Sequence, residues 1–180
     1  MNRLRTAILF LVVFMVAGCV HVISSDLRGK ASPPVSLIQV AKNPEAYKGK
    51  WVVWGGEIIE TVNLQDGSTE IEIFQRPLGW RDEPKQTVAS EGRFLVLTDK
   101  YLDPYLYRKG RRITIAGEIV GEKIKPLGQM SYKYPIVSTS QIYLWQEYYY
   151  PPYPYYYYYD PWWPGYPYGW WGGDIHYHHR

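Results

Sequence analysis

A repeated segment with a glycine inside each expected strand is the strongest constraint on the fold. The segment 43–59, which begins Asn-Pro, is echoed by 103–120, which begins Asp-Pro. Each copy contains a capped turn, a basic corner with glycine, and a strand rich in branched and aromatic residues. Gly56 and Gly117 fall mid-strand, where glycine often marks a bend or bulge. Bends of this kind let a small sheet coil and close, although two unrelated hairpin strands with similar turns would give the same pattern.

Period-two patterns and turn residues predict five strands. They are expected over residues 51–62, 69–75, 94–98, 113–120 and 136–145. Ser36 is positioned to cap a short helix before the first strand. Asp103-Pro104 is expected to open a short helix between the third and the fourth. This order is that of an OB-type barrel, so we predict a mainly β domain over residues 36–147, with a small five-stranded OB-like barrel that is closed or partly open.

The N-terminus has the pattern of a bacterial export signal. Arg3 and Arg5 precede an apolar run over 7–17, which is shorter than the about 20 residues that a spanning helix needs. A basic start, a short apolar middle and small residues before a cut site are typical of a signal peptide, here residues 1–18. A soluble secreted protein would carry the same leader.

The end of this leader predicts a lipid anchor. Val16, Ala17, Gly18 and Cys19 resemble the lipobox, in which the cysteine thiol receives diacylglycerol and the new N-terminus is acylated. We therefore predict Cys19 as the lipid attachment site, with these acyl chains and no other cofactor. The alternative is a secreted protein in which this cysteine is incidental.

Charge and cysteine content exclude several classes of function. Removing residues 1–18 takes away two arginines and no acid, which leaves 18 basic against 17 acidic residues. No block of like charge remains, so a nucleic-acid partner is not expected. Cys19 is the single cysteine, which excludes an intramolecular disulfide. Residues 19–35, the lipidated N-terminus and a stretch rich in Ser, Gly and Pro, are expected to form a flexible tether of roughly 20–25 Å.

The last 33 residues, 148–180, form a low-complexity segment with twelve Tyr, four Trp and six Pro. Proline favours extended conformations, so we predict a disordered tail with available aromatic side chains. Tyr and Trp suit contact with lipid headgroups, with peptidoglycan or with an envelope protein; an extension with no ligand is the alternative. His176, His178 and His179 could share a metal ion weakly.

Residues 36–147 offer little catalytic chemistry. They contain no His and no Cys, so Ser-His-Asp and Cys-His machinery is absent. Carboxylates remain as candidates, among them Glu57, Glu60, Glu70, Glu72, Glu118 and Glu122. Two carboxylates about 5–10 Å apart can hydrolyse glycosides, but no cleft is indicated, and Glu70 and Glu72 are expected to be solvated on the polar face of one strand. We predict that the protein is not an enzyme, with a carboxylate-based hydrolase as a minor alternative.

Short pieces in a fixed order resemble the Slp family, the starvation-inducible outer-membrane lipoproteins of Gram-negative bacteria. The pieces are Asn43-Pro44, Tyr47-Lys48-Gly49, Gly56-Glu57-Ile58, Gly92-Arg93-Phe94-Leu95, Asp103-Pro104, Gly110-Arg111, Gly117-Glu118, Tyr132-Lys133-Tyr134-Pro135-Ile136-Val137 and Leu144-Trp145. The resemblance covers roughly residues 36–146 together with the lipobox. The segment after Trp145 is not expected to belong to the family pattern.

This resemblance implies a lipoprotein anchored through Cys19 in the outer membrane, at its periplasmic face, with a link to starvation or stress and no catalytic activity. Val20 agrees with that location, because the family's sorting logic retains proteins with Asp after the cysteine in the inner membrane. A cell-wall or surface-binding module that acts through the aromatic tail is the alternative function.

Overall fold

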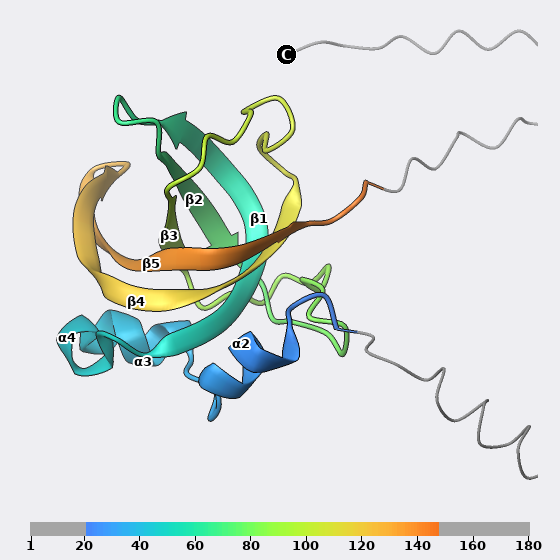
Figure 1. The fold of residues 1–180 in the computed structure, drawn as a ribbon. Helices are drawn as coiled ribbons and strands as arrows, with labels where there is room; N and C mark the ends of the chain where they lie inside the picture. The colour runs from blue at the N-terminus through green and yellow to red at the C-terminus, as the bar shows by residue number, and fades with distance from the viewer. Residues whose placement is uncertain (1–20, 148–180) are drawn as a thin grey trace, which may run out of the picture. The chain divides into compact units, whose positions relative to one another are not determined.

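The computed structural model describes residues 21–147, which form a small β-barrel with short helices at one end (Figure 1). The helices are α2 (Ser25–Lys30), α3 (Leu37–Lys42) and α4 (Pro44–Tyr47). The strands are β1 (Trp51–Asn63), β2 (Thr69–Gln75), β3 (Arg93–Thr98), β4 (Arg112–Leu127) and β5 (Met130–Leu144). All five predicted strands are therefore present.

The strands close into a barrel in the order β1-β2-β3-β5-β4. Neighbours are antiparallel except β3 and β5, which run parallel. Five strands in this arrangement make an OB-type barrel. The predicted mainly β, OB-like fold is confirmed, and of the two forms that the sequence left open the barrel is the closed one.

The two copies of the sequence repeat lie side by side in the barrel wall. β1 pairs with β4 so that Trp54 faces Ile115, which is its own counterpart in the second copy. Gly56 of the first copy faces Ile113, and Gly117 of the second faces Val52. The pairing therefore has an approximate twofold axis at Trp54 and Ile115, which makes the repeat a structural unit rather than a coincidence of turn chemistry.

The corner glycines of the repeat make matching hydrogen bonds across this axis. The N–H of Gly49 donates to the carbonyl of Ile119 (2.8 Å), and the N–H of Gly110 donates to the carbonyl of Ile58 (2.9 Å). Both glycines have positive φ, 82° and 86°, a conformation that other residues rarely adopt. Each corner thereby joins the start of one repeat strand to the far part of the other.

The mid-strand glycines allow close approach of neighbouring backbones. A Cβ at Gly56 would fall under 3.0 Å from the carbonyl oxygen of Phe74 on β2, and one at Gly117 would do the same at Ser138 on β5. The ladder between β4 and β5 also shifts register between Ala116 and Gly117. At Gly117 this irregularity agrees with the predicted bend or bulge, whereas at Gly56 the structure shows the close approach alone.

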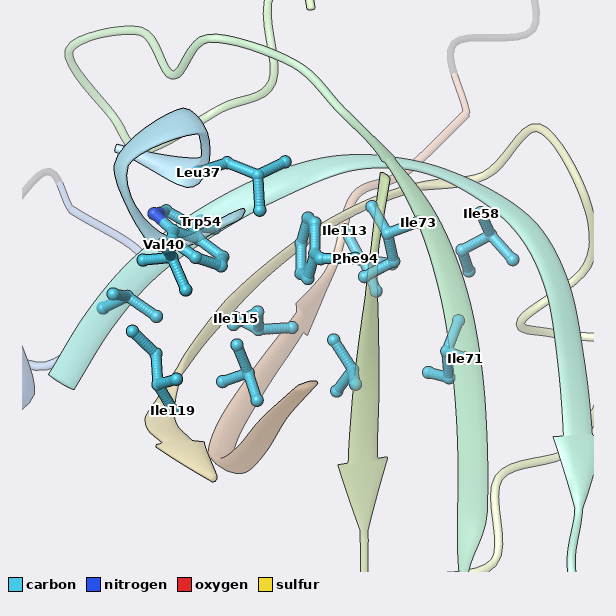
Figure 2. Packing of buried hydrophobic residues seen from close by; sticks show 13 residues of the cluster. Leu37, Val40, Trp54, Ile58, Ile71, Ile73, Phe94, Ile113, Ile115 and Ile119 are labelled. Atoms are coloured by element: carbon cyan, nitrogen blue, oxygen red, sulfur yellow. The ribbon is translucent and has the colours of Figure 1, made fainter. Parts of the chain in front are cut away.

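The core fills the barrel and is closed at one end by α3 (Figure 2). The hydroxyl of Ser36 accepts the N–H of Gln39 (3.2 Å), and the side chain of Gln39 accepts the N–H of Ser36 (3.0 Å). This capping box fixes the start of α3 as predicted. Leu37 and Val40 on the same helix are buried beside Trp54, so the helix acts as a plug.

The connection between β3 and β4 contains less helical structure than expected. The carboxylate of Asp103 accepts the N–H of Tyr105 (2.8 Å), and its carbonyl accepts the N–H of Tyr107 (3.0 Å). These bonds make a single capped turn and not a helix. The cap chemistry was predicted correctly, but the bonding does not propagate.

The β4–β5 hairpin is much longer than the sequence pattern suggested. β4 continues to Leu127 and β5 already begins at Met130, whereas strands were expected only up to residue 120 and from residue 136. We call residues 121–135 the hairpin arm. Its polar composition resembles a loop, yet it remains a paired two-stranded ribbon to its tip at Gly128.

The flexible coil expected between the anchor and the barrel is wrong for residues 21–35. This segment contains α2 and has Ile23 and Ala31 buried. The indole N–H of Trp54 donates to the carbonyl of Val35 (2.9 Å). Ser, Gly and Pro set the composition of this stretch, but a few apolar side chains dock it. We call residues 21–35 the docked segment.

Candidate functional site

The predicted attachment site lies just beyond the described chain. Cys19 and the lipobox residues Val16, Ala17 and Gly18 lie outside residues 21–147, as do His176, His178 and His179. His21 follows Cys19 after one intervening residue. If Cys19 is acylated as predicted, the contacts of the docked segment decide how close the barrel is held to the lipid.

The first described residues are fixed to β5. The side-chain amide of Gln141 donates to the carbonyl of Val22 (3.0 Å) and accepts the N–H of Ser24 (3.1 Å). Between them, Ile23 is only 2% exposed. Gln141 thus offers the segment one donor and one acceptor, as a neighbouring strand would. Attachment of the chain to the barrel begins three residues after Cys19 rather than after a long tether.

A buried carboxylate from the β2–β3 loop lies against the same segment. Asp82 is 7% exposed, and its carboxylate pairs with the guanidinium of Arg28 at 3.3 Å. Burial is the largest influence and raises the pKa of Asp82 above its ordinary value of 3.8; Arg28 and the N–H of Ile23 offset it only in part. Its surroundings therefore do not fully compensate the charge that helps to hold the segment.

Glu70 does not have the solvated position that the sequence predicted. It is 7% exposed, because the hairpin arm packs over the outer face of β2. Lys123 and Lys125 on the arm reach its carboxylate with Nζ–Oε distances of 2.7 and 3.3 Å. Burial, the largest influence, would raise the pKa of Glu70, but the hydrogen bonds and charges of the two lysines outweigh it, and the net effect lowers the pKa. Glu70 is thus held as a carboxylate.

Glu72, predicted to be solvated as well, is 8% exposed. Its carboxylate accepts hydrogen bonds from Arg93 (2.7 Å) and from the hydroxyl of Tyr134 (3.2 Å). Burial, followed by the charge of Glu72, raises the pKa of Tyr134 above its ordinary value of 10.0, so the phenol stays a donor. Period-two alternation correctly placed both glutamates on the outer face, but it carries no signal that the arm covers that face.

This network occupies the surface that OB folds commonly use for ligands. In such barrels the face of strands 2 and 3 and the adjoining loops bind oligonucleotides and oligosaccharides. Here Leu95 on that face is fully buried and the arm's Tyr134 is 1% exposed. The protein's own hairpin therefore covers that part of the face, and the glutamates beneath it are already ion-paired within the protein.

The two glutamates at matching places in the repeat are far apart. Glu57 lies opposite Arg112, and Glu118 lies opposite Trp51. Six residues of extended strand separate these register positions, or about 20 Å. A pair of carboxylates for glycoside hydrolysis needs about 5–10 Å. Glu57 is in addition ion-paired with Arg76 at 2.9 Å, so these two residues cannot work as a catalytic pair.

A cavity of about 540 Å³ lies between the β3–β4 connection and β5. Its lining combines hydroxyl groups with one acid, one base and a few apolar side chains: Thr98, Asp99, Lys100, Leu102, Tyr107, Ser138, Thr139, Ser140 and Ile142. Such a lining can hydrogen-bond a polar ligand but offers no nucleophile paired with a base. The cavity could not be predicted from the sequence, because its hydroxyl groups come from segments far apart in the chain.

Residues 21–147 contain neither a membrane-spanning helix nor a cluster of metal ligands. No helix between residues 21 and 147 is long and apolar enough to cross a membrane. Over the same range no cluster of three or more His, Cys, Asp or Glu side chains could hold a metal ion. The histidines proposed for metal binding lie beyond this range, so that hypothesis stays a prediction.

Comparison with known families assigns the chain. A model described as the outer membrane lipoprotein Slp family matches residues 16–172. The chain belongs to the Slp family. The match includes Val16 to Cys19, so the lipobox and the barrel are parts of one family pattern. The predicted resemblance is confirmed, and association with the outer membrane as a lipoprotein follows at the level of the family.

Individual relatives agree with this assignment. The uncharacterized lipoprotein YeaY of Escherichia coli (strain K12) is 31% identical over 161 residues, covering 86% of this chain and 80% of YeaY. An uncharacterized protein of Haemophilus influenzae is 30% identical over 130 residues, covering 66% of this chain and 70% of that protein. Both relatives therefore align with most of their own length.

Solved structures similar to this Slp chain include single-stranded DNA-binding proteins. One is the small protein from Streptomyces coelicolor, with 11% identity and a TM-score of 0.36. Another is the mitochondrial protein Rim1 of S. cerevisiae, with 11% identity and a TM-score of 0.34. Each match covers 53% of this chain and 94% of the other chain.

One sequence-based expectation about the family is wrong. The segment after Trp145 was expected to lie outside the Slp pattern, but the match continues to residue 172. Most of the aromatic tail therefore belongs to the matched region. Low-complexity composition, with its run of tyrosines, hid this relationship.

Proposed function

We propose that this Slp-family protein is acylated on Cys19 and holds a non-catalytic OB-like barrel directly at the periplasmic face of the outer membrane. The observation that carries the proposal is the short spacing between the lipobox cysteine and the docked segment. Ile23, four residues after Cys19, is buried on the barrel. Four extended residues span at most about 14 Å, so an acyl group there would hold the barrel close to the bilayer.

Acylation is tested by labelling cells with radioactive palmitate and separating membranes. The wild-type chain should take up label and stay with outer membranes, whereas Cys19→Ser should be unlabelled and released. A matched control is the double variant Cys19→Ser/Ser25→Cys, which keeps one thiol but moves it out of the lipobox to an exposed position. Label in this control, or membrane retention of Cys19→Ser, would refute attachment through Cys19.

The periplasmic orientation and the link to stress are separate parts of the proposal. The absence of Asp after Cys19 and the family's outer-membrane description support the location. Protease added to intact cells should leave the protein uncut, and permeabilised cells should lose it. Protein abundance should rise when cultures enter starvation; equal amounts in growing and starved cells would contradict a starvation role.

A non-catalytic role is supported by the positions of the carboxylates. Glu70 and Glu72 are locked in ion pairs under the hairpin arm, and Glu57 is about 20 Å from Glu118 along the sheet. Because the hairpin arm covers this face, it is not open to a nucleic-acid partner. Hydrolysis of glycan substrates that is lost in Glu57→Gln or Glu118→Gln would overturn this part.

A second candidate function is binding of the cell wall by the aromatic tail. The family match through residue 172 favours it, because the tail is then more than an incidental extension. Sedimentation with purified peptidoglycan should retain the full chain and lose a truncation after Glu147. Equal retention of both forms would remove the tail from this role.

A further inference from the structure

The tip of the β2–β3 loop is a small, preformed structure next to the anchored end of the chain. The N–H of Asp82 donates to the carbonyl of Gly79 (3.0 Å), which makes Trp80 and Arg81 the central residues of a β-turn. The N–H of Gly79 in turn donates to the carbonyl of Glu83 (2.8 Å). The turn is thus closed at its base and presents two side chains at its tip.

This turn is fastened to the barrel rather than free to move. The hydroxyl of Thr114 on β4 donates to the carbonyl of Asp82 (2.6 Å). The guanidinium of Arg112 donates to Glu83 (2.7 Å) and to the carbonyl of Pro84 (3.3 Å). Since β4 is a barrel strand, the direction in which the tip points is fixed by the fold.

The turn also lies close to the acylated residue. Asp82 pairs with Arg28 of the docked segment, and the N–H of Ile23 lies near enough to its carboxylate to affect its pKa. Ile23 is four residues from Cys19, so at most about 14 Å of chain separates it from the lipid. The β2–β3 loop and the start of the docked segment are neighbours at the lower right of the barrel in Figure 1.

The chemistry of the tip suits a lipid headgroup layer. Trp80 is 73% exposed, and the guanidinium of Arg81 lies 5.9 Å from its ring. Arg81 and Lys85, both exposed, have no ion-pair partner among residues 21–147, whereas the acids Asp82 and Glu83 are paired. The unpaired charge at the tip is therefore positive.

Trp is the side chain most typical of the membrane–water interface, and basic residues there are attracted to anionic lipids. We propose that Trp80 and Arg81 form a second membrane contact, with anionic phospholipid headgroups of the bilayer that holds the lipid on Cys19. The contact orients the barrel with the β2–β3 turn toward the lipid. The inference rests on the proposed acylation of Cys19, which supplies the membrane.

The other end of the barrel provides a matched control. Tyr105 is 80% exposed and belongs to the β3–β4 connection, which packs on the start of β2 through the bond from the N–H of Leu102 to Thr69 (3.1 Å). The Trp80 turn follows the end of β2. β2 separates the two aromatic side chains by its length, so only one of them can face the bilayer.

The experiment uses the single cysteine of the chain. In the acylated protein the thiol of Cys19 is blocked, so Gln86→Cys or Tyr105→Cys carries the only free thiol for an environment-sensitive fluorophore. Gln86 is exposed beside the turn, so the probe leaves Trp80 and Arg81 in place. Each labelled protein is placed in vesicles of phosphatidylethanolamine and phosphatidylglycerol. We expect blue-shifted emission and several-fold slower quenching by an aqueous quencher at position 86, but not at position 105. Adding Trp80→Ala to the Gln86→Cys protein should reduce the shift.

A second measurement does not depend on acylation. The mature chain with Cys19→Ser should bind these vesicles weakly, and Arg81→Gln should lower the affinity about fivefold, the effect of about 1 kcal/mol per basic side chain. Tyr105→Ala should leave it unchanged.

The outcomes separate the inference from the proposed function. If the acylated protein floats with vesicles but the probe at position 86 reports water, the anchor stands and the second contact is refuted. If the protein does not float, yet the Arg81→Gln effect is found with the Cys19→Ser chain, the acylation proposal fails and the lipid-binding turn stands. Equal binding of Arg81→Gln and its parent would refute the role of Arg81.

Discussion

Two segments cover the barrel from outside, and they are held by carboxylates in opposite situations. The hairpin arm covers β2 and β3 and reaches Glu70 with two lysines. The docked segment reaches Asp82 with one arginine. Both acids are buried, but the pKa of Glu70 is lowered and that of Asp82 is raised. The charge of Glu70 is overcompensated by its partners, whereas that of Asp82 is not.

This difference indicates that the hairpin arm is an integral part of the barrel, whereas the docked segment is attached to its surface. The arm continues two barrel strands, and its buried Tyr134 is tied to the charge network below. The docked segment precedes the core in the sequence. Where it contacts Asp82, pairing with Arg28 offsets only part of the cost of burying the carboxylate. We infer that the arm contributes to the stability of the whole domain, and that the docked segment is the part that can detach at low cost.

The largest effect is expected from the arm. Tyr134→Ala removes a side chain that is 1% exposed and leaves Glu72 without its phenol donor. Loss of a large buried aromatic residue typically costs about 3–5 kcal/mol. The urea midpoint of the whole domain should fall accordingly, in one transition. A loss under about 1 kcal/mol would show that the arm is an independent cover and would remove the contrast.

A smaller effect is expected at Glu70. Glu70→Gln removes the charge that pairs with Lys123 and Lys125, and since both lysines can return to water we expect a loss of about 1–2 kcal/mol at pH 7. Because the fold lowers the pKa of Glu70, its stabilisation is present above the ordinary value of 4.5 and is lost as the pH falls through the folded-state pKa. Urea unfolding of both proteins between pH 7 and pH 3 should converge at the acid end. A constant difference would contradict the ionic origin.

The smallest effect, and of opposite sign, is expected at Asp82. Because the fold raises its pKa, the charged form is disfavoured above that pKa, and the wild type gains stability as the pH falls through it. Asp82→Asn should therefore be neutral or stabilising by up to about 0.5 kcal/mol at pH 7, and Asn tolerates the φ of 64° at this position. Urea midpoints at pH 7 and pH 4 measure both parts. A clear loss at pH 7 would show that the Arg28 pair outweighs burial.

The sequence predicted the barrel because its signals are local. Gly56 and Gly117 indicated a bend in their strands, Ser36 indicated the start of its helix, and alternation along β2 placed Glu70 and Glu72 on the face opposite the buried Ile71 and Ile73. Each of these depends on residues within a few positions. The repeat was recognised in the sequence, but only the structure shows that its two copies pair with each other.

The covers could not be predicted for the same reason. Nothing in the sequence near Glu70 indicates that Lys123, far along the chain, will cover it. The polar residues of the hairpin arm have the composition of a loop, so a paired ribbon was not predicted there. In the docked segment the few apolar residues follow no clear periodicity, so the burial of Ile23 depends on contacts with distant residues such as Gln141 and Asp82. The hydroxyl-lined cavity is likewise assembled from distant segments. The lipobox could be recognised without the structure, because its four residues are consecutive in the sequence.

The hydrogen bonds around Thr114 have a mechanical consequence. The indole of Trp145 donates to its hydroxyl (2.9 Å), that hydroxyl donates to Asp82 (2.6 Å), and Gln141 of β5 holds Val22 (3.0 Å). The last strand, β5, is thus tied to the first described residues after Cys19. Tension between a membrane-bound Cys19 and a ligand held by the tail would run across this short tie instead of through the length of the barrel. The core would stay unloaded while the two ends of the chain are pulled apart.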